Sequence, residues 1–435
     1  MLKIIFKNLW HRRRANGWLF VELILVSILL WFIMGQVVSL TYPTSQPVGY
    51  DADRLILFSF ESYPPDSEKY SSESDSAQAM HKDIERIFNK IKLRKEYESA
   101  TIAVACDYIN SSTVTISGFH TGNPGVDSVR KGTFVLNFVS GTDFFETYGI
   151  KQLVKNSDRS LSETGKDVGI IITKEIADSY WPGEKSFGKG VIKEVTEQGD
   201  TVWTPVVGVV SDTRYRSYFN TYSIVFYPYE LNEDDKIEEF EVIARIRPGV
   251  KGIDAAYDAF QWGVKELNDG NYYLANVKDY GTIIDAQEAH SVGTPVAIFK
   301  ILAAFFLISL VLGTIGTMSL QVRRRYRETG VLRSFGASKS QIVTMLLGES
   351  AVLVTVAFLI ADLLYFQWAH KYGLYQGFGS VSYNMSDNWI TNFGVHFIII
   401  SVISYLIILL TVIIGTLLPA LSLSRVNPVE ALRNE

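Results

Sequence analysis

The chain has 435 residues, of which 47% are hydrophobic and 20% charged, and its formal net charge is −5. This average conceals two kinds of segment, because four long stretches carry almost no charge while the long segment after the first of them is polar and acidic. An acidic segment of this size argues against nucleic acid as a partner. The sequence therefore predicts a membrane part and a separate folded part.

Four apolar stretches are each long enough to cross the ~30 Å hydrocarbon core of a bilayer as a helix. We expect these transmembrane helices at residues 18–40, 296–320, 346–368 and 394–418. A cleavable signal peptide is the alternative for the first stretch, but the apolar run is long for one and no small-x-small cleavage pattern follows it. The first stretch is therefore expected to remain as a membrane anchor.

The positions of the basic residues predict the topology. They gather before the first stretch and again between the second and third, whereas the loop at 369–393 contains only Lys371. By the positive-inside rule, the basic sides face the cytoplasm. The expected cytoplasmic parts are the N-terminal segment 1–17, the segment 321–345 and the tail 419–435, and the expected outer parts are residues 41–295 and 369–393.

Residues 41–295 are expected to form one α+β extracytoplasmic domain. The predicted helices are residues 77–96, with Ile84, Ile87 and Phe88 on one face, and residues 253–267. The predicted strands are residues 54–60, 101–109, 113–119, 134–139, 168–173, 203–210, 223–227, 240–246 and 272–276. The fold class is thus membrane α-helical, with four transmembrane helices, plus an α+β domain. Cys106 is the only cysteine, so no intrachain disulfide can form, and it is expected to be buried in a strand.

The sequence offers no catalytic or metal-binding constellation. No nucleophile, base and orienting group can be assembled, and the six histidines lack metal-ligand spacing. Residues 183–189 match a P-loop through Lys189, but Gly190 stands where Ser or Thr would bind Mg²⁺. We therefore expect a turn at 183–189, no catalytic residue, no metal site and no cofactor bound by this chain.

Polar residues inside the expected spans are candidates for a role in the membrane. Glu349 and Asp362 stand out, because a carboxylate at the bilayer centre costs ~3 kcal/mol. They could pair helices or relay motion, or they could lie near an interface and reach the headgroups. Gly313 and Gly316 place small residues on adjacent turns of the second helix, which permits close packing with another helix.

The segment after the second span carries a distinctive motif. Residues 325–338 read RYRETGVLRSFGAS, and residues from about 328 to 347 are predicted to form a short amphipathic helix that leads into the third span. Such a helix can dock in a groove of another protein. The alternative is a helix that lies at the lipid surface with its arginines on anionic headgroups.

Two cytoplasmic segments resemble the same family. Residues 325–338 are similar to the signature that follows the second helix of MacB-like and FtsX-like ABC transporter permeases, and Pro419-Ala420 with RVNPVEALR at 425–433 is similar to their ending. In the outer domain, residues 168–177, 180–183 and 206–214 resemble stretches of the MacB periplasmic core. The resemblance implies a Porter subdomain built from both ends of the outer segment and a Sabre subdomain inserted at about 125–222.

The resemblance also implies site residues and partners. The expected ATPase-coupling residues are Arg327, Glu328, Gly330, Arg333, Gly336 and Ala337, and the expected C-terminal motif is Pro428, Glu430, Leu432 and Arg433. The cytoplasmic segments are too short to hold a fused ATPase, so a separate ABC ATPase chain would bind ATP and Mg²⁺. A second permease copy or a paralogue would complete a dimer, and a periplasmic adaptor or an outer-membrane channel could join it.

The function that this implies is the transmission of ATP-driven motion to the outer domain, for export or extrusion, by a type VII permease subunit in the inner membrane. This permease subunit is not expected to be an enzyme itself, because ATP hydrolysis is expected in the separate ATPase chain. Within the same architecture, the alternative is an FtsX-like regulator of an extracytoplasmic partner. A ligand-sensing receptor is the alternative from another class, but the cytoplasmic segments show no kinase, HAMP or methyl-accepting region.

Overall fold

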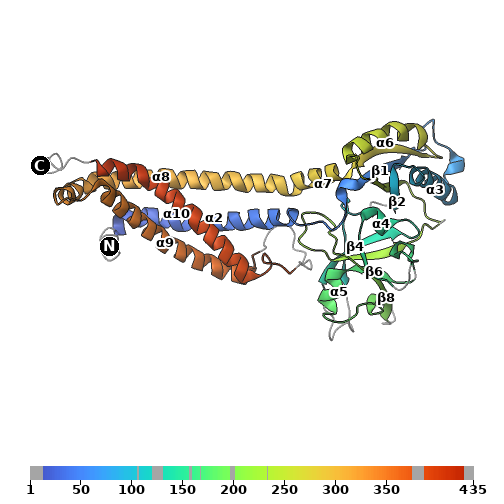
Figure 1. Ribbon diagram of the computed structural model, residues 1–435, viewed down its shortest axis with the longest axis horizontal. Coiled ribbons are helices and arrows are strands. Elements are labelled where there is room, and N and C mark those ends of the chain that lie inside the picture. The colour runs from blue at the N-terminus through green and yellow to red at the C-terminus, as the bar shows by residue number, and fades with distance from the viewer. Residues whose placement is uncertain are drawn as a thin grey trace. The chain divides into compact units, whose positions relative to one another are not determined.

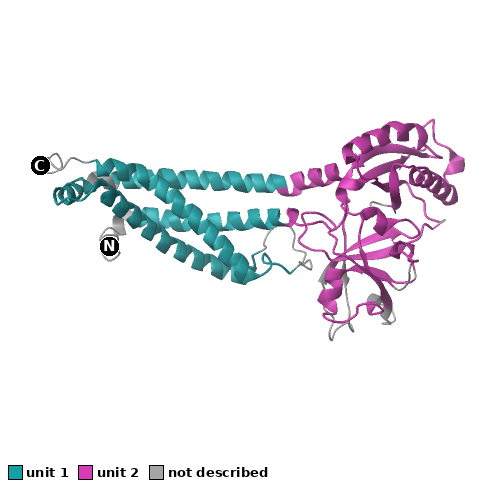
Figure 2. Cartoon of the chain, in the orientation of Figure 1, with its two compact units in different colours: residues 1–42, 293–380, 387–435 teal, residues 43–292, 381–386 magenta. Residues whose placement is uncertain are grey.

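The computed structural model describes residues 13–104, 107–119, 131–155, 159–166, 168–195, 201–232, 234–374 and 387–425. The chain forms two compact units (Figure 2). A helical unit comprises residues 1–42, 293–380 and 387–435, and an outer unit comprises residues 43–292 and 381–386. Cys106, and with it the expectation that it is buried in a strand, lies outside the described residues.

The helical unit is built from long apolar helices: α2 (Arg13–Thr44), α8 (Thr294–Ser334), α9 (Lys339–Tyr372) and α10 (Phe393–Ser424). Among the described residues, these four are long and apolar enough to cross a membrane, so the predicted membrane-helical part of the fold is confirmed. Helix α10 packs on both α8 and α9 (Figure 1). Leu23 of α2, Leu310 of α8, Val354 of α9 and Ile408 of α10 belong to one buried cluster.

The outer unit is an α+β domain with two sheets. The first sheet has the strand order β11-β1-β10-β2, and its neighbouring strands are antiparallel. Its strands are β1 (Leu55–Ser62), β2 (Tyr97–Val104), β10 (Glu239–Ile246) and β11 (Tyr272–Asp279). It therefore joins strands from both ends of the outer segment.

The second sheet has the order β3-β4-β9-β6-β8-β5, and β7 also pairs with β8. Its strands are β3 (Thr115–Phe119), β4 (Lys131–Val139), β5 (Gln152–Lys155), β6 (Ile170–Thr173), β7 (Gly190–Val195), β8 (Thr201–Val210) and β9 (Ile224–Tyr229). The helices of the unit are α3 (Ala77–Lys92), α4 (Phe144–Tyr148), α5 (Lys174–Tyr180), α6 (Gly252–Glu266) and α7 (Tyr280–Glu288). The strands of this sheet thus lie between Thr115 and Tyr229, whereas the resemblance placed an inserted subdomain at about 125–222.

Alternation along β1 explains how the first sheet is covered on both faces. Ile56, Phe58 and Phe60 belong to a core shared with α3 and α6, whereas Leu55 and Leu57 belong to a core shared with the second sheet. Successive side chains of a strand point to opposite faces, so one strand can serve both cores. The second core joins the two sheets into one domain.

Candidate functional site

The basic segment after the second span forms a turn between two helices. Helix α8 ends at Ser334 and α9 begins at Lys339. The single amphipathic helix expected from about 328 to 347 is therefore wrong. The apolar spacing on each side of the turn is helical, but two local signals interrupt it.

The first signal ends α8. Gly336 has a φ of +92°. Its amide donates to the carbonyl oxygen of Arg333, and the amide of Ala337 donates to that of Leu332, both at 3.0 Å. This pair of bonds is the Schellman motif, in which a glycine in a left-handed conformation ends a helix and satisfies its last carbonyls.

The second signal starts α9. The amide of Gln341 donates to Oγ of Ser338 at 3.2 Å, and the amide of Ser338 donates to Oε1 of Gln341 at 2.9 Å. This reciprocal arrangement is a capping box. The sequence contains its Ser-x-x-Gln pattern, so the break could have been predicted by giving this pattern and Gly336 more weight than the apolar spacing.

The candidate coupling residues surround this turn. Arg327 and Glu328 are exposed on α8, and Gly330 is buried. Arg333 donates from Nη1 to the carbonyl oxygen of Ser424 at 3.0 Å. Ser424 is the last residue of α10, and the final carbonyls of a helix have no partner within it. Arg333 therefore caps α10 and ties it to the end of α8.

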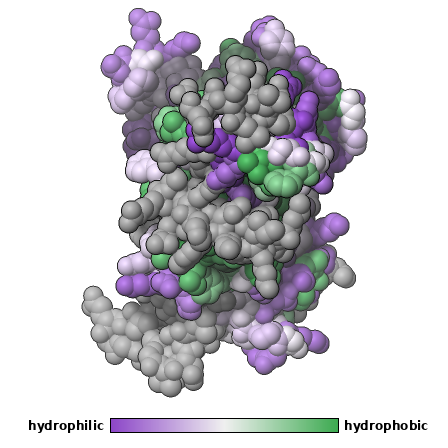
Figure 3. Space-filling model, turned by 90° about the vertical axis from the view of Figure 1, so that its left-hand side faces the viewer, coloured by the Kyte–Doolittle hydropathy of each residue, from purple (hydrophilic) through white to green (hydrophobic). Residues whose placement is uncertain are grey.

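The tip of the turn is apolar and exposed. Phe335 is 87% exposed, and Val331 and Leu332 of the preceding helical turn are 40% and 41% exposed. Figure 3 looks onto this end of the helical unit, where green apolar residues lie among purple polar ones. Phe335, Val331 and Leu332 thus form a small exposed apolar patch at the tip of the turn.

Glu349 lies in the core of the helical unit and pairs with Arg325. Oε2 of Glu349 is 2.5 Å from Nη1 of Arg325, and the two side chains are 4% and 5% exposed. The interpretation that Glu349 reaches the headgroups at an interface is therefore wrong, since its carboxylate is enclosed between α8 and α9. Sequence reasoning noted Arg325 within the motif but assigned it no role.

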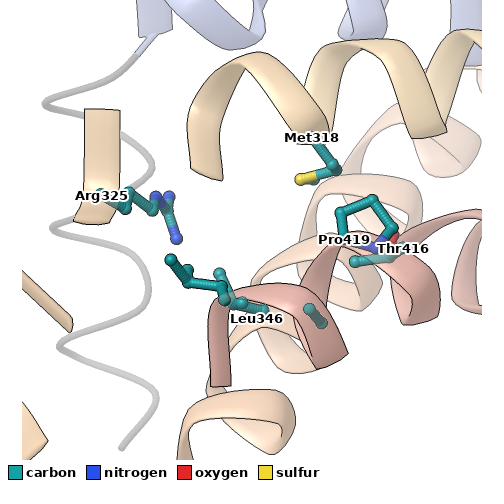
Figure 4. A pocket seen from close by; sticks show the side chains of 7 residues that line it. Met318, Arg325, Leu346, Thr416 and Pro419 are labelled. Atoms are coloured by element: carbon teal, nitrogen blue, oxygen red, sulfur yellow. The ribbon is translucent and has the colours of Figure 1, made fainter. Parts of the chain in front are cut away.

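A small cavity lies beside this ion pair. Figure 4 shows Arg325 of α8 pointing toward Leu346 of α9, with Thr416 and Pro419 of α10 across the cavity. Proline has no N–H, so Pro419 also leaves the carbonyl of Gly415 without its usual helical partner. Charged and polar groups from α8, α9 and α10 thus meet at one end of the unit.

Asp362 joins three helices. Ser401 of α10 donates from Oγ to Oδ1 of Asp362 at 2.6 Å, and Trp31 of α2 donates from Nε1 to Oγ of Ser401 at 2.9 Å. Hydrogen bonds between polar side chains stabilise helix pairs in a membrane, where water cannot replace them. Asp362 therefore has a defined packing role.

Of the two glycines predicted to permit close helix packing, Gly313 has a neighbouring side chain against it and Gly316 has none. A Cβ at Gly313 would lie 2.5 Å from Oε1 of Glu22, so the carboxylate of α2 rests directly on this position. Nothing lies within 4 Å of a Cβ at Gly316. A third glycine, which the sequence analysis did not single out, makes the close contact between α8 and α10: a Cβ at Gly415 would be 3.0 Å from Cβ of Thr314.

Two other predicted segments add little to the site. Pro428, Glu430, Leu432 and Arg433 lie outside the described residues. In the P-loop-like segment, the amide of Gly188 donates to the carbonyl oxygen of Val206 at 2.8 Å, and Nζ of Lys189 is 2.8 Å from Oε2 of Glu184. The segment thus forms turns against β8.

Within the part of the chain that the structure describes, no group of His, Cys, Asp or Glu is placed to hold a metal ion.

Residues 300–428 match the family model for the FtsX-like permease C-terminal domain. No curated protein sequence matches the chain. Among solved structures, the chain is similar to the periplasmic region of MacB from Actinobacillus actinomycetemcomitans, at 12% identity and a TM-score of 0.32, covering 56% of this chain and 97% of that one.

Two further solved structures are similar at the same level. A permease-protein domain from Porphyromonas gingivalis is 13% identical, with a TM-score of 0.29, and the match covers 54% of this chain and 99% of that one. The extracellular domain of the ABC-type transporter YknZ from Gram-positive bacteria is 13% identical, with a TM-score of 0.26, and the match covers 51% of this chain and 100% of that one.

In the described part of the chain, four apolar helices are long enough to span a bilayer and a large α+β domain lies between the first and second, an arrangement that fits a membrane protein. Its second, third and fourth long helices lie largely within residues 300–428, the part of the chain that matches the model of the FtsX-like permease C-terminal domain.

Proposed function

We propose that this chain is the permease subunit of an ABC transporter complex and that the α8–α9 turn docks on a separate ATPase subunit. The observation that carries this proposal is the turn itself. It combines the 87% exposed ring of Phe335 with a backbone fixed on both sides, by the Schellman motif and by the capping box. A fixed turn with an apolar tip loses little conformational entropy when it enters a groove.

The charge pattern supports the proposed sidedness. The turn lies in the most basic segment of the helical unit, and the positive-inside rule places such a segment in the cytoplasm, where ATP is available. The chain from Pro43 to Val292 then faces the outside. For a cell with two membranes, we infer that this is the inner membrane, with the outer unit in the periplasm.

The proposed work is mechanical. Closure of the ATPase would move the α8–α9 turn, and α8 would carry that motion toward the outer unit for export or extrusion. Along the chain, α7, the π-helical segment Ala289–Gly293 and α8 follow one another without a loop. A helical connection of this kind along the chain would let motion of α8 reach the segment that leads into the outer unit.

A second permease copy, identical or paralogous, is part of the proposal. The span of α8 is 11% buried within the chain, and Ile301, Phe305 and Leu312 are among its exposed residues. Four helices of this kind enclose no pathway, so a dimer that works by moving its outer domains suits them better than a channel does. ATP and Mg²⁺ would bind the ATPase, and a periplasmic adaptor or outer-membrane channel could add to the complex.

Phe335→Asp tests the docking. We expect this variant to insert in the membrane normally and to lose at least ten-fold of the ATPase that copurifies with the wild type, because a carboxylate cannot enter an apolar groove without desolvation. Leu93→Asp is the matched control, since Leu93 is 82% exposed in the outer unit. Equal copurification of ATPase by wild type and Phe335→Asp would contradict the proposal.

The lipid-surface alternative is separated by Phe335→Trp. Tryptophan is favoured at membrane interfaces, so a turn that rests on lipid would tolerate it. In a groove shaped for phenylalanine, the larger ring should weaken ATPase association. Two results together would favour the FtsX-like regulatory role over export. One is copurification of an extracytoplasmic hydrolase with the chain, and the other is that cells lacking the chain accumulate no substrate.

A further inference from the structure

The buried ion pair Arg325–Glu349 links α8 to α9 on the far side of the two helix ends that flank the α8–α9 turn. Arg325 lies nine residues before the end of α8, which corresponds to about 14 Å of helix, and Glu349 lies ten residues after the start of α9, about 15 Å. The pair thus joins the two helices at nearly equal distances from the turn. The capped turn forms one end of this unit and the ion pair the other.

Because it is buried, the ion pair contributes little to the free energy of folding, but it allows only one alignment of α8 against α9. Both side chains lose almost all their contact with water, and this desolvation offsets much of their attraction. Apolar residues of similar size would hold the helices together at least as well. Apolar surfaces, however, can slide past one another, whereas a buried charge must meet its partner and so allows one alignment.

Contacts around the pair bring α10 into the same unit. Oγ1 of Thr416 donates to Oγ of Ser350, the residue after Glu349, at 3.2 Å, and Arg333 caps α10 through the carbonyl oxygen of Ser424. All three helices of the permease domain are therefore linked by polar contacts within a few turns of the α8–α9 turn.

We propose that Arg325 and Glu349 are a positioning pair that fixes the register of α8 against α9, so that a push on the turn moves both helices together. The pair does not contact the ATPase, because both side chains are buried while the apolar tip of the turn is exposed. This inference rests on the proposed function. Without the Arg325–Glu349 pair, movement of α8 relative to α9 would absorb the motion of the turn.

The decisive variant replaces the pair by apolar residues. Arg325→Met with Glu349→Leu should fold, keep or raise the thermal stability of the wild type, and copurify the same amount of ATPase. Stimulation of ATP hydrolysis by the permease should nevertheless fall at least five-fold. Full stimulation in this stable double variant would overturn the proposal.

Charge reversal provides the complementary test. Glu349→Gln and Arg325→Gln should each lower stimulation, and Arg325→Glu combined with Glu349→Arg should recover at least half of it. A reversed pair no better than the single variants would also count against the proposal. Lys371→Gln, which removes an exposed charge at the other end of α9, is the matched control and should leave stimulation unchanged.

A second readout does not depend on the ATPase. Spin labels at Lys300 of α8 and Lys371 of α9, both exposed, report the register of the two helices in the purified chain with Cys106 replaced by Ser. The apolar double variant should broaden the distance distribution or shift its maximum, because α8 and α9 then lose their single alignment. An unchanged distribution overturns the positioning role, whereas the absence of any copurifying ATPase with the wild type would overturn only the proposed function.

Discussion

Glu146 of α4 shows how one carboxylate is held in the outer domain. It accepts hydrogen bonds from Nε2 of Gln152 at 2.8 Å, from Oγ of Ser162 at 2.6 Å and from Oγ of Ser160. Burial by itself would raise the pKa of this carboxyl, but the three donors outweigh burial, and the pKa of Glu146 lies below its usual value. Hydrogen bonds to the charged form stabilise that form.

Glu146→Gln is therefore expected to destabilise the chain in a pH-dependent way. A lowered pKa in the folded state contributes stability above the unfolded pKa of about 4.3, and this contribution is lost as the pH falls through the folded value. We expect a loss of about 1 kcal/mol at pH 7, kept small because Glu146 is partly exposed, and a smaller loss below pH ~4. Thermal unfolding in detergent at both pH values measures it. Glu163→Gln, on an exposed carboxylate nearby, should show no such pH dependence.

Gly149 ends α4 at a crowded position. Its φ is +71°, and a Cβ there would lie 2.7 Å from Nη1 of Arg245 and 2.9 Å from Oδ2 of Asp51. Arg245 is itself 8% exposed; it donates to the carbonyl oxygen of Thr147 at 3.1 Å and pairs with Asp51. The glycine thus makes room for Arg245 of the first sheet, which pairs with Asp51 and donates a hydrogen bond to α4.

Gly149→Ala should cost more than backbone strain alone. Gly141→Ala is the matched control, because Gly141 has a φ of +81° and nothing within 4 Å of its Cβ position. An alanine in this conformation loses about 1 kcal/mol. We expect Gly149→Ala to lose about 2 kcal/mol more, from displacement of Arg245. Equal melting temperatures for the two variants would show that Arg245 moves aside freely.

At the scale of elements, the sequence predicted those whose pattern is long or strongly periodic. The observed α3, α6, β1 and β10 agree with prediction to within a few residues, because their apolar spacing matches the helical or strand period. Strands β5 and β7 were missed. β5 has four residues, and its exposed Leu153 and Val154 give no alternation to detect.

Only the local part of the site was predicted, because sequence patterns report local structure and not contacts between distant residues. The motif at 325–338 marked the segment, yet the Arg325–Glu349 pair joins two residues 24 positions apart on different helices. A single sequence contains no signal for which buried charges meet across helices. Local hydrogen bonds such as the capping box are readable from spacing, whereas tertiary pairs are not.

The packing of α10 on α8 gives a prediction at this scale. Gly415→Leu should separate the two helices, since a Cβ at this position already lies 3.2 Å from the carbonyl oxygen of Val311. We expect a loss of about 2 kcal/mol from overpacking, seen as a lower unfolding temperature in detergent. Gly316→Leu adds the same side chain to α8 where nothing lies within 4 Å, and it should be tolerated. Similar losses in both variants would mean that leucine, and not the contact, is the cause.

For the whole molecule, the separation into an apolar helical unit and an acidic outer unit was readable from composition alone, because a bilayer and water select different side chains. The order of strands in the two sheets could not be predicted from composition. Pairing of β1 with β10 and β11 depends on contacts between distant parts of the chain.

Labelling in intact cells tests the topology. With Cys106 replaced by Ser, cysteines at Lys265 of α6 and Ser340 at the start of α9 are both exposed in the chain. The first should react with a membrane-impermeant thiol reagent, and the second only after the cells are permeabilised. Reaction at Ser340→Cys in intact cells would place the α8–α9 turn outside and exclude contact with a cytoplasmic ATPase.

The position of β1 also has a consequence for biogenesis. Leu57 of β1 pairs with Ile243 and Lys278, so both partner strands are synthesised long after β1. At ~5–20 residues per second, the delay is on the order of ten seconds or longer. During that time the two edges of an apolar strand lie open outside the membrane and can pair with other chains. A chain interrupted before β11 leaves β1 with an open edge, and we expect the cell to degrade it instead of accumulating a shorter folded protein.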